Sequence, residues 1–138
     1  MNIMKYEILE HTADIGIRAF GKDLPELYAN AAFGMFEIIF GRRATNSKER
    51  VTVEVAGVDA ENLMVRWLSE LLNLSREGWV FGGFKIMDIN EKKLRAECRG
   101  QKRHLASKPK TEIKLVTYHG LKVEKDEEEY KAEIIFDV

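Results

Sequence analysis

The sequence has few of the residues that mark small secreted proteins or membrane proteins. Cys98 is the only cysteine, so no internal disulfide can form, which fits a reducing compartment. No apolar run approaches the roughly 20 residues that a membrane-spanning helix needs. The first residues, MNIMKYEILEH, lack the apolar core of a secretory signal. We therefore expect a soluble cytoplasmic protein with no membrane contact.

A large net charge of one sign is also absent. The sequence has 22 basic and 23 acidic side chains, which gives a formal charge of −1. A dedicated nucleic-acid-binding protein is usually clearly basic, since phosphate contacts supply most of its affinity. The balance argues against RNA binding through a broad face and leaves a local basic patch open. One candidate is the segment from Arg99 to Lys110, which holds five Lys or Arg residues and no acid. It is either a solvated loop or a contact for phosphate, nucleotide or an acidic partner.

Familiar catalytic motifs are missing as well. The sequence contains no Ser-His-Asp nucleophile elbow, no P-loop and no dinucleotide fingerprint. The pair Gly82-Gly83 is too short to cradle phosphate and predicts a β-bulge. The three histidines, His11, His104 and His119, lack the i, i+4 spacing of a helical metal motif. His119 is either a hydrogen-bonded structural residue or part of a functional site.

What is present describes a packed globule with a solvated surface. Hydrophobic residues make up 45% of the 138 residues and charged residues 33%. A chain of this size buries roughly two-thirds of the surface that it exposes when unfolded, which is enough for one sizeable core. The sequence shows neither an internal repeat nor a linker, so we expect a single domain over residues 1–138. Cys98 falls in a predicted strand with no activating base beside it and is interpreted as structural.

Two segments have the apolar spacing of amphipathic helices. The first follows Asp23, a capping residue that has Glu26 three positions later, and its apolar repeat runs to Gly41, a suitable helix end. The second follows Asp59 and carries a wide apolar stripe as far as Gly78. These two segments give the most regular patterns in the chain.

Short strands account for most of the remaining sequence. Alternation of apolar and polar residues and apolar runs predict strands over 5–9, 15–20, 51–56, 80–89, 93–99, 113–118, 121–124 and 130–138. Two pairs of them are expected to form hairpins, one turning near Asn90 and one around the acidic residues 126–129. This order favours an α+β fold in which two helices pack on a largely antiparallel β-sheet.

Two aspartates stand out as candidates for chemistry. Asp14 follows a turn-like segment, where it either bonds its own backbone or faces a ligand. Asp137 ends an apolar segment, and the carboxylate of Val138 adds a second anion. That end either frays in water or pairs into the sheet, and two ordered carboxylates then need a Lys, an Arg or a metal ion as counter-charge. If Asp14 lies beside them, three hard oxygen ligands would suit Ca²⁺, Mg²⁺ or Mn²⁺ and not structural zinc.

Several segments, in order along the whole chain, resemble the archease family. They are HTADIG at 11–16, the stretch Leu24–Glu37, WLSELL at 67–72, EIK at 112–114 with VTYH at 116–119, and IFDV at 135–138. Either HTADIG or the final IFDV alone would be weak, whereas both together in a chain of this length form a specific combination.

The resemblance implies an archease-like single domain that acts as a non-catalytic protein cofactor of an RtcB-type tRNA-splicing RNA ligase. Archeases promote guanylylation of that ligase, support its multiple turnover and broaden its nucleotide use, so the tRNA would be contacted only through the ligase. The family's metal site, often occupied by Ca²⁺, corresponds here to Asp14, Asp137 and Val138. A lysine that matters for activation corresponds to Lys114, and we group His119 with it as a partner-facing residue.

Two other functions stay open. A small metal-dependent phosphoesterase could use the same carboxylates, although no base or nucleophile stands near them in the sequence. A chaperone-like modulator of RNA-modifying proteins would suppress the aggregation of unrelated proteins without affecting a ligase.

Overall fold

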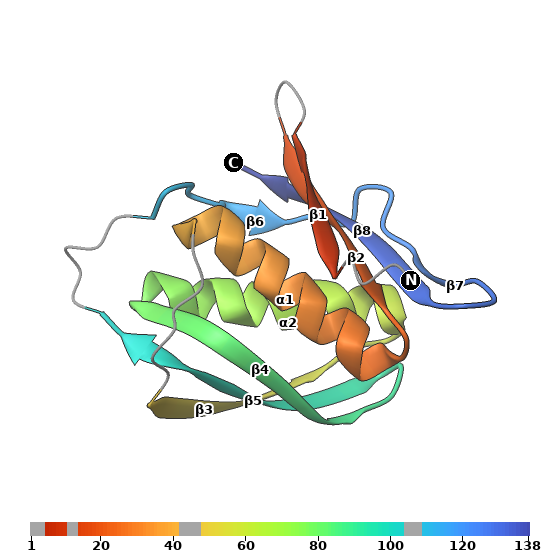
Figure 1. Ribbon diagram of the computed structural model, residues 1–138, viewed down its shortest axis with the longest axis horizontal. Helices are drawn as coiled ribbons and strands as arrows, with labels where there is room; N and C mark the ends of the chain where they lie inside the picture. The colour runs from red at the N-terminus through yellow and green to blue at the C-terminus, as the bar shows by residue number, and fades with distance from the viewer. Residues whose placement is uncertain (1–4, 11–13, 42–47, 104–108) are drawn as a thin grey trace.

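The computed structural model describes residues 5–10, 14–41, 48–103 and 109–138, which form two helices and eight strands (Figure 1). In chain order these are β1 (Tyr6–Glu10), β2 (Ile15–Gly21), α1 (Leu24–Phe40), β3 (Glu49–Ala56), α2 (Ala60–Arg76), β4 (Trp79–Ile89), β5 (Lys93–Lys102), β6 (Leu115–Val116), β7 (Val123–Lys125) and β8 (Tyr130–Asp137). His11, His104 and part of the basic segment lie outside the described residues.

The strands divide between two sheets. Sheet A has the order β1-β2-β8-β6, with β7 also paired to β8, and sheet B has the order β3-β5-β4. Every strand pair within the described ranges is antiparallel. The predicted α+β fold is therefore confirmed. The strands form two sheets and not one, because β8 returns to pair with β2 and leaves the strands of the middle of the chain to pair among themselves.

Both helices lie in a layer between the two sheets (Figure 1). Helix α1 packs against β2 of sheet A and β4 of sheet B, and α2 contacts β6 and β3. Polar groups inside this layer are hydrogen-bonded: the indole Nε1 of Trp67 donates to the carbonyl of Tyr28 at 2.9 Å, and the Tyr28 hydroxyl donates to the carbonyl of Ala60 at 2.7 Å. Each sheet thus buries one face against the helices and turns its other face outward.

The helix ends agree with the predicted caps. The side chains of Asp23 and Asp59 accept hydrogen bonds from the backbone N–H of Glu26 at 2.9 Å and Asn62 at 2.7 Å. Gly41, with a φ of 84°, takes the conformation that favours glycine and ends α1. Neither of these helices combines the length and the apolar character that a membrane span requires, a finding limited to the described residues.

The strand expected over 113–118 is much shorter than predicted. Only Leu115 and Val116 pair with β8. The guanidinium of Arg76, at the end of α2, donates to the carbonyls of Ile113 at 3.0 Å and Lys114 at 2.6 Å. Those carbonyls therefore bond to the helix end and not to a neighbouring strand, which shortens β6.

The two hairpins and the bulge are confirmed. Asn90 accepts hydrogen bonds from the backbone N–H of Lys92 and Lys93 and closes the turn between β4 and β5. Asp126 does the same in the turn before β8, and its pKa is lowered by the backbone N–H groups from which it accepts hydrogen bonds. The register of β4 shifts between Phe81 and Gly83, where Gly82 bulges.

The thiol of Cys98 provides a test of the core. Cys98 is fully buried in β5, and burial, with a smaller contribution from the charge of Glu97, raises its pKa to about 12. Because the thiolate is the reactive form, we expect no reaction of the folded protein with a disulfide reagent at pH 8 and one thiol per chain after unfolding in guanidinium. Rapid labelling under native conditions would contradict this packing.

The close approach of β2 and β8 provides a second test. A Cβ at Gly16 would lie 2.6 Å from the carbonyl oxygen of Ile134 and 2.9 Å from Cδ1 of Ile135. We expect Gly16→Ala to lower the free energy of unfolding by about 1–3 kcal/mol, measured by guanidinium denaturation, because the strands must separate. Gly83→Ala is the control, since its nearest contact would be an ordinary 3.6 Å. Equal losses in both variants would show that the strands are not packed this closely.

Candidate metal and partner site

Asp14 and Asp137 lie at the same end of the paired strands β2 and β8. The last paired residues at this end are Ile15 and Phe136, so Asp14 directly precedes this pair on one strand and Asp137 directly follows it on the other. Figure 1 shows the end of β8 beside the β1–β2 hairpin. The sheet thus brings two residues from opposite ends of the chain to the same end of two paired strands, a placement that the sequence alone left open.

The alternation of the strands decides which face the two aspartates occupy. Ile17 and Ile134 are fully buried and point to the helices, and Phe136 does so as well. Since adjacent residues point to opposite faces, Asp14 and Asp137 point to the outer face of sheet A, and both are exposed. The two carboxylates therefore lie where a ligand or another protein can reach them.

Lys114 and Val138 adjoin this pair. Leu115 pairs with Asp137, and the backbone N–H of Lys114 donates to the carbonyl of Asp137 at 2.7 Å. The carbonyl of Lys114 accepts from Arg76, so its backbone is held on both sides while its side chain is exposed. Leu115 and Val138 are 49% and 39% exposed, which is unusual for residues of this size and apolar character.

An ion-paired arginine occupies the same outer face, further along the strands. The guanidinium of Arg18 donates to Glu7 at 2.6 Å and to Glu133 at 3.0 Å and 3.3 Å. These bonds, that to Glu133 first, raise the pKa of Arg18. Because Arg18 is already shared between two carboxylates, it is not available as the counter-charge for Asp137. Sequence analysis missed this triad, although Arg18 occupies an outward position of an alternating strand.

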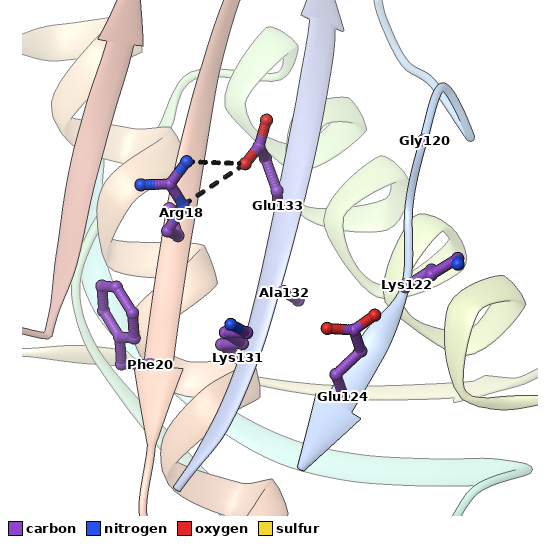
Figure 2. Close-up of a pocket in the computed structure, with 8 residues that line it drawn as sticks. All are labelled: Arg18, Phe20, Gly120, Lys122, Glu124, Lys131, Ala132 and Glu133. Carbon is purple, nitrogen blue, oxygen red and sulfur yellow. Dashed lines mark hydrogen bonds and ion pairs between the residues drawn. The ribbon is translucent and has the colours of Figure 1, made fainter. Parts of the chain in front are cut away.

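The triad borders a shallow groove of about 500 Å³. Figure 2 shows its lining, which comes from β2, β8 and the segment around β7: Arg18, Phe20, Gly120, Lys122, Glu124, Lys131, Ala132 and Glu133. Cations and carboxylates alternate around the groove, so it presents no charge of one sign to a ligand.

His119 lies in the turn after β6 and not beside the aspartates. Its backbone N–H donates to the hydroxyl of Thr117 at 3.2 Å, and that hydroxyl donates to the carbonyl of Ile135 at 2.9 Å. The neighbouring Tyr118 hydroxyl accepts from the amide of Asn62, which ties the turn to α2. The exposed imidazole of His119 can face a partner, but the structure does not bring it into the carboxylate pair.

The chemistry of the donor set fits a hard divalent cation. Neither aspartate takes part in the ion pairs found among the described residues, so their charges are not neutralised there by Lys or Arg. Within the same residues, no three His, Cys, Asp or Glu side chains gather to bind a metal. The two carboxylates would therefore hold a cation with help from other oxygens, namely the carboxylate of Val138, backbone carbonyls or water, as Ca²⁺ commonly accepts.

Sequence comparison with known proteins identifies one family. The model of the Archease protein family matches residues 6–138. The chain is 39% identical over 140 residues to protein archease of Methanosarcina mazei, which covers 97% of this chain and 96% of that one. It is 38% identical over 144 residues to protein archease of Pyrococcus furiosus, and the alignment covers 97% of this chain and 99% of that one.

Solved structures have the same architecture. The solution structure of protein 1598 of Methanobacterium thermoautotrophicum matches with a TM-score of 0.79 and 29% identity, covering 97% of this chain and 99% of that one. The crystal structure of an archease from Thermotoga maritima, described as a possible chaperone, matches with a TM-score of 0.64 and 25% identity over the full length of both chains. The fold, the match of nearly every residue to the family and the identity to its curated members together establish that this chain belongs to the archease family.

Proposed function

We propose that this archease activates an RtcB-type tRNA-splicing RNA ligase in the cytoplasm, by promoting its guanylylation and multiple turnover and broadening its nucleotide use, and is not itself an enzyme. The observation that supports this is that Asp14 and Asp137, both exposed, flank the last residue pair of β2 and β8, with Lys114 directly before β6. The cation that we propose for the pair is Ca²⁺, with Mg²⁺ and Mn²⁺ as alternatives.

Charge explains how such a surface can assist guanylylation. The reaction requires a triphosphate, a metal ion and a histidine to lie together in the ligase. An activator can therefore help by stabilising the arrangement in which the histidine is positioned to attack the triphosphate. A bound cation would relieve the repulsion between the two carboxylates and order this edge of sheet A. The ammonium of Lys114, on a backbone held from both sides, can then meet a phosphate or a carboxylate of the ligase. A hundredfold acceleration requires only about 2.7 kcal/mol of preferential stabilisation.

The surroundings of the pair suit a protein partner. Leu115 and Val138 offer exposed apolar surface directly beside the charged groups. An apolar centre surrounded by a polar rim is typical of a protein–protein interface. This arrangement favours a docking surface over a catalytic cleft, since the groove on sheet A lies further along the strands.

The first test removes the charge of each aspartate without changing its size. We expect Asp14→Asn and Asp137→Asn to bind Ca²⁺ at least tenfold more weakly in calorimetry, about 1.4 kcal/mol, and to lose most of their stimulation of ligase guanylylation with radiolabelled GTP. Asp88→Asn, an exposed strand aspartate of sheet B, is the control. Circular dichroism checks that all three variants remain folded.

Three outcomes would contradict the proposal. The first is full stimulation by both variants, which would remove the carboxylate pair from the mechanism. The second is metal-dependent hydrolysis of a phosphodiester by this protein alone, which would favour the phosphoesterase. The third is suppression of the aggregation of unrelated proteins with no effect on a ligase, which would favour the chaperone-like function.

A second test separates partner binding from metal binding. We expect Lys114→Ala to keep the Ca²⁺ affinity of the unmodified protein and to lose stimulation of guanylylation, because its ammonium faces the partner. Lys92→Ala, an exposed lysine in the turn between β4 and β5, serves as the control in both assays. Normal stimulation by Lys114→Ala would show that this lysine does not bind the ligase.

A further inference from the structure

The outer face of sheet B carries a row of charged side chains. Along β5, Leu94, Ala96, Cys98 and Gly100 are buried against the helices, and the alternate residues point outward. The outward residues of the three strands include Arg50, Lys85, Lys93, Arg95, Glu97 and Arg99. All of these residues are exposed except Glu97, which is half-buried.

Two arginines lie directly opposite each other at one end of this face. Arg50 of β3 pairs in register with Arg99 of β5. Like charges in opposite cross-strand positions repel, which is unfavourable unless something neutralises them. Their side chains are 62% and 45% exposed, so both guanidinium groups are accessible.

A single carboxylate serves both arginines. Glu97 Oε1 lies 3.1 Å from Nε of Arg99 and 3.8 Å from Nε of Arg50. A third cation, Lys85, stands opposite Glu97 in the register of β4. Two arginines therefore share one carboxylate here, and most of their guanidinium N–H donors have no partner among the described residues.

The residue of β4 opposite Arg99 is a glycine, so no side chain of β4 covers the two arginines at that position. Arg99 faces Gly83, next to the bulge, and a Cβ there would make only an ordinary contact of 3.6 Å with Arg99. Three more exposed cations adjoin the same end of the sheet: Lys48, Lys102 and Arg103.

The other end of the face differs in charge. Arg95 lies opposite Glu54 on one side and Asp88 on the other, so it has a carboxylate on each flanking strand. The excess of positive charge is therefore confined to the end that holds Arg50, Lys85 and Arg99, which we name the basic end.

We propose that the basic end of sheet B is a binding site for the phosphate backbone of single-stranded RNA. Arginine binds phosphate through paired N–H donors, and two guanidinium groups side by side can neutralise successive phosphates. Within the described strands, the outer face carries no aromatic side chain on which a base could stack, so binding is to the backbone and is independent of sequence.

The composition of the face favours RNA over an acidic protein. Protein interfaces bury an apolar or aromatic centre, whereas nucleic-acid interfaces are polar and positively charged. Around Arg50 and Arg99 the outward neighbours are polar, namely Thr52, Lys85, Glu97 and Gln101. The apolar Val80, opposite Gln101, is buried. The proposal thus departs from the sequence-based expectation that RNA is met only through a ligase, and it puts RNA on a different sheet from Asp14 and Asp137.

The experiment measures binding of a fluorescein-labelled single-stranded RNA of 12 nucleotides by anisotropy over a series of salt concentrations. We expect the unmodified protein to bind at low salt and Arg50→Gln/Arg99→Gln to bind about tenfold more weakly. The slope of log affinity against log salt should fall by about 0.7 for each phosphate that the variant no longer neutralises. Glu97→Gln should bind more tightly, because it frees both arginines from their shared carboxylate.

Arg95→Gln is the matched control for the single variant Arg99→Gln, since each removes one charge from the same strand and the same face. It should bind like the unmodified protein if the basic end is the site. An equal loss in Arg95→Gln would overturn the proposal in favour of unspecific attraction, as would absence of binding at low salt. Competition by polyglutamate as effective as that by RNA would also overturn it and indicate an acidic protein partner.

This proposal and ligase activation can fail separately. Guanylylation of a ligase by GTP takes place without RNA, so Arg50→Gln/Arg99→Gln should stimulate it normally. Loss of that stimulation, with circular dichroism unchanged, would assign these arginines to the ligase interface and overturn the RNA assignment.

Discussion

The antiparallel register of β2 and β8 is the constraint on which the candidate site and much of the core depend. A slip of one residue would turn Ile17, Ile134 and Phe136 outward and bring the charged positions into the core, so burial holds the register firmly. The same register brings Asp14 and Asp137 to one end of the two strands, although they lie near opposite ends of the chain. The acidic pair is therefore a by-product of core packing.

The layered architecture keeps two surfaces of different charge apart. The helices fill the space between the sheets, so the outer faces of sheet A and sheet B look away from each other (Figure 1). One carries the carboxylate pair at the end of β8, and the other carries the arginine pair of β3 and β5. The net charge of −1 gives no sign of this separation. Acidic and basic residues are nearly equal in number over the whole chain, but they are unevenly distributed over its surface.

Features that depend on neighbouring residues could be predicted from the sequence, and features that depend on distant pairing could not. The helices follow from caps such as Asp23 and from their apolar stripes, and the hairpin from Asn90. The division into two sheets depends on pairing between remote strands. Alternation of apolar and polar residues shows which side of a strand is buried but not which strand pairs with it. For the same reason Arg99 was noticed within a basic segment, whereas Arg50, its partner across the sheet, was not. Arg76 was missed because a helix arginine gives no sign that it will bind the carbonyls of a later segment.

The brevity of β6 has a consequence for the behaviour of the protein at high concentration. An exposed sheet edge is a template on which another chain can add a strand, and a neighbouring apolar residue such as Leu115 would encourage it. Here only two residues of that edge are extended, and the backbone just before them is committed to Arg76. An incoming strand would find too few free N–H and C=O groups to hold it. This edge of sheet A can thus display apolar surface for recognition without offering a template for an added strand.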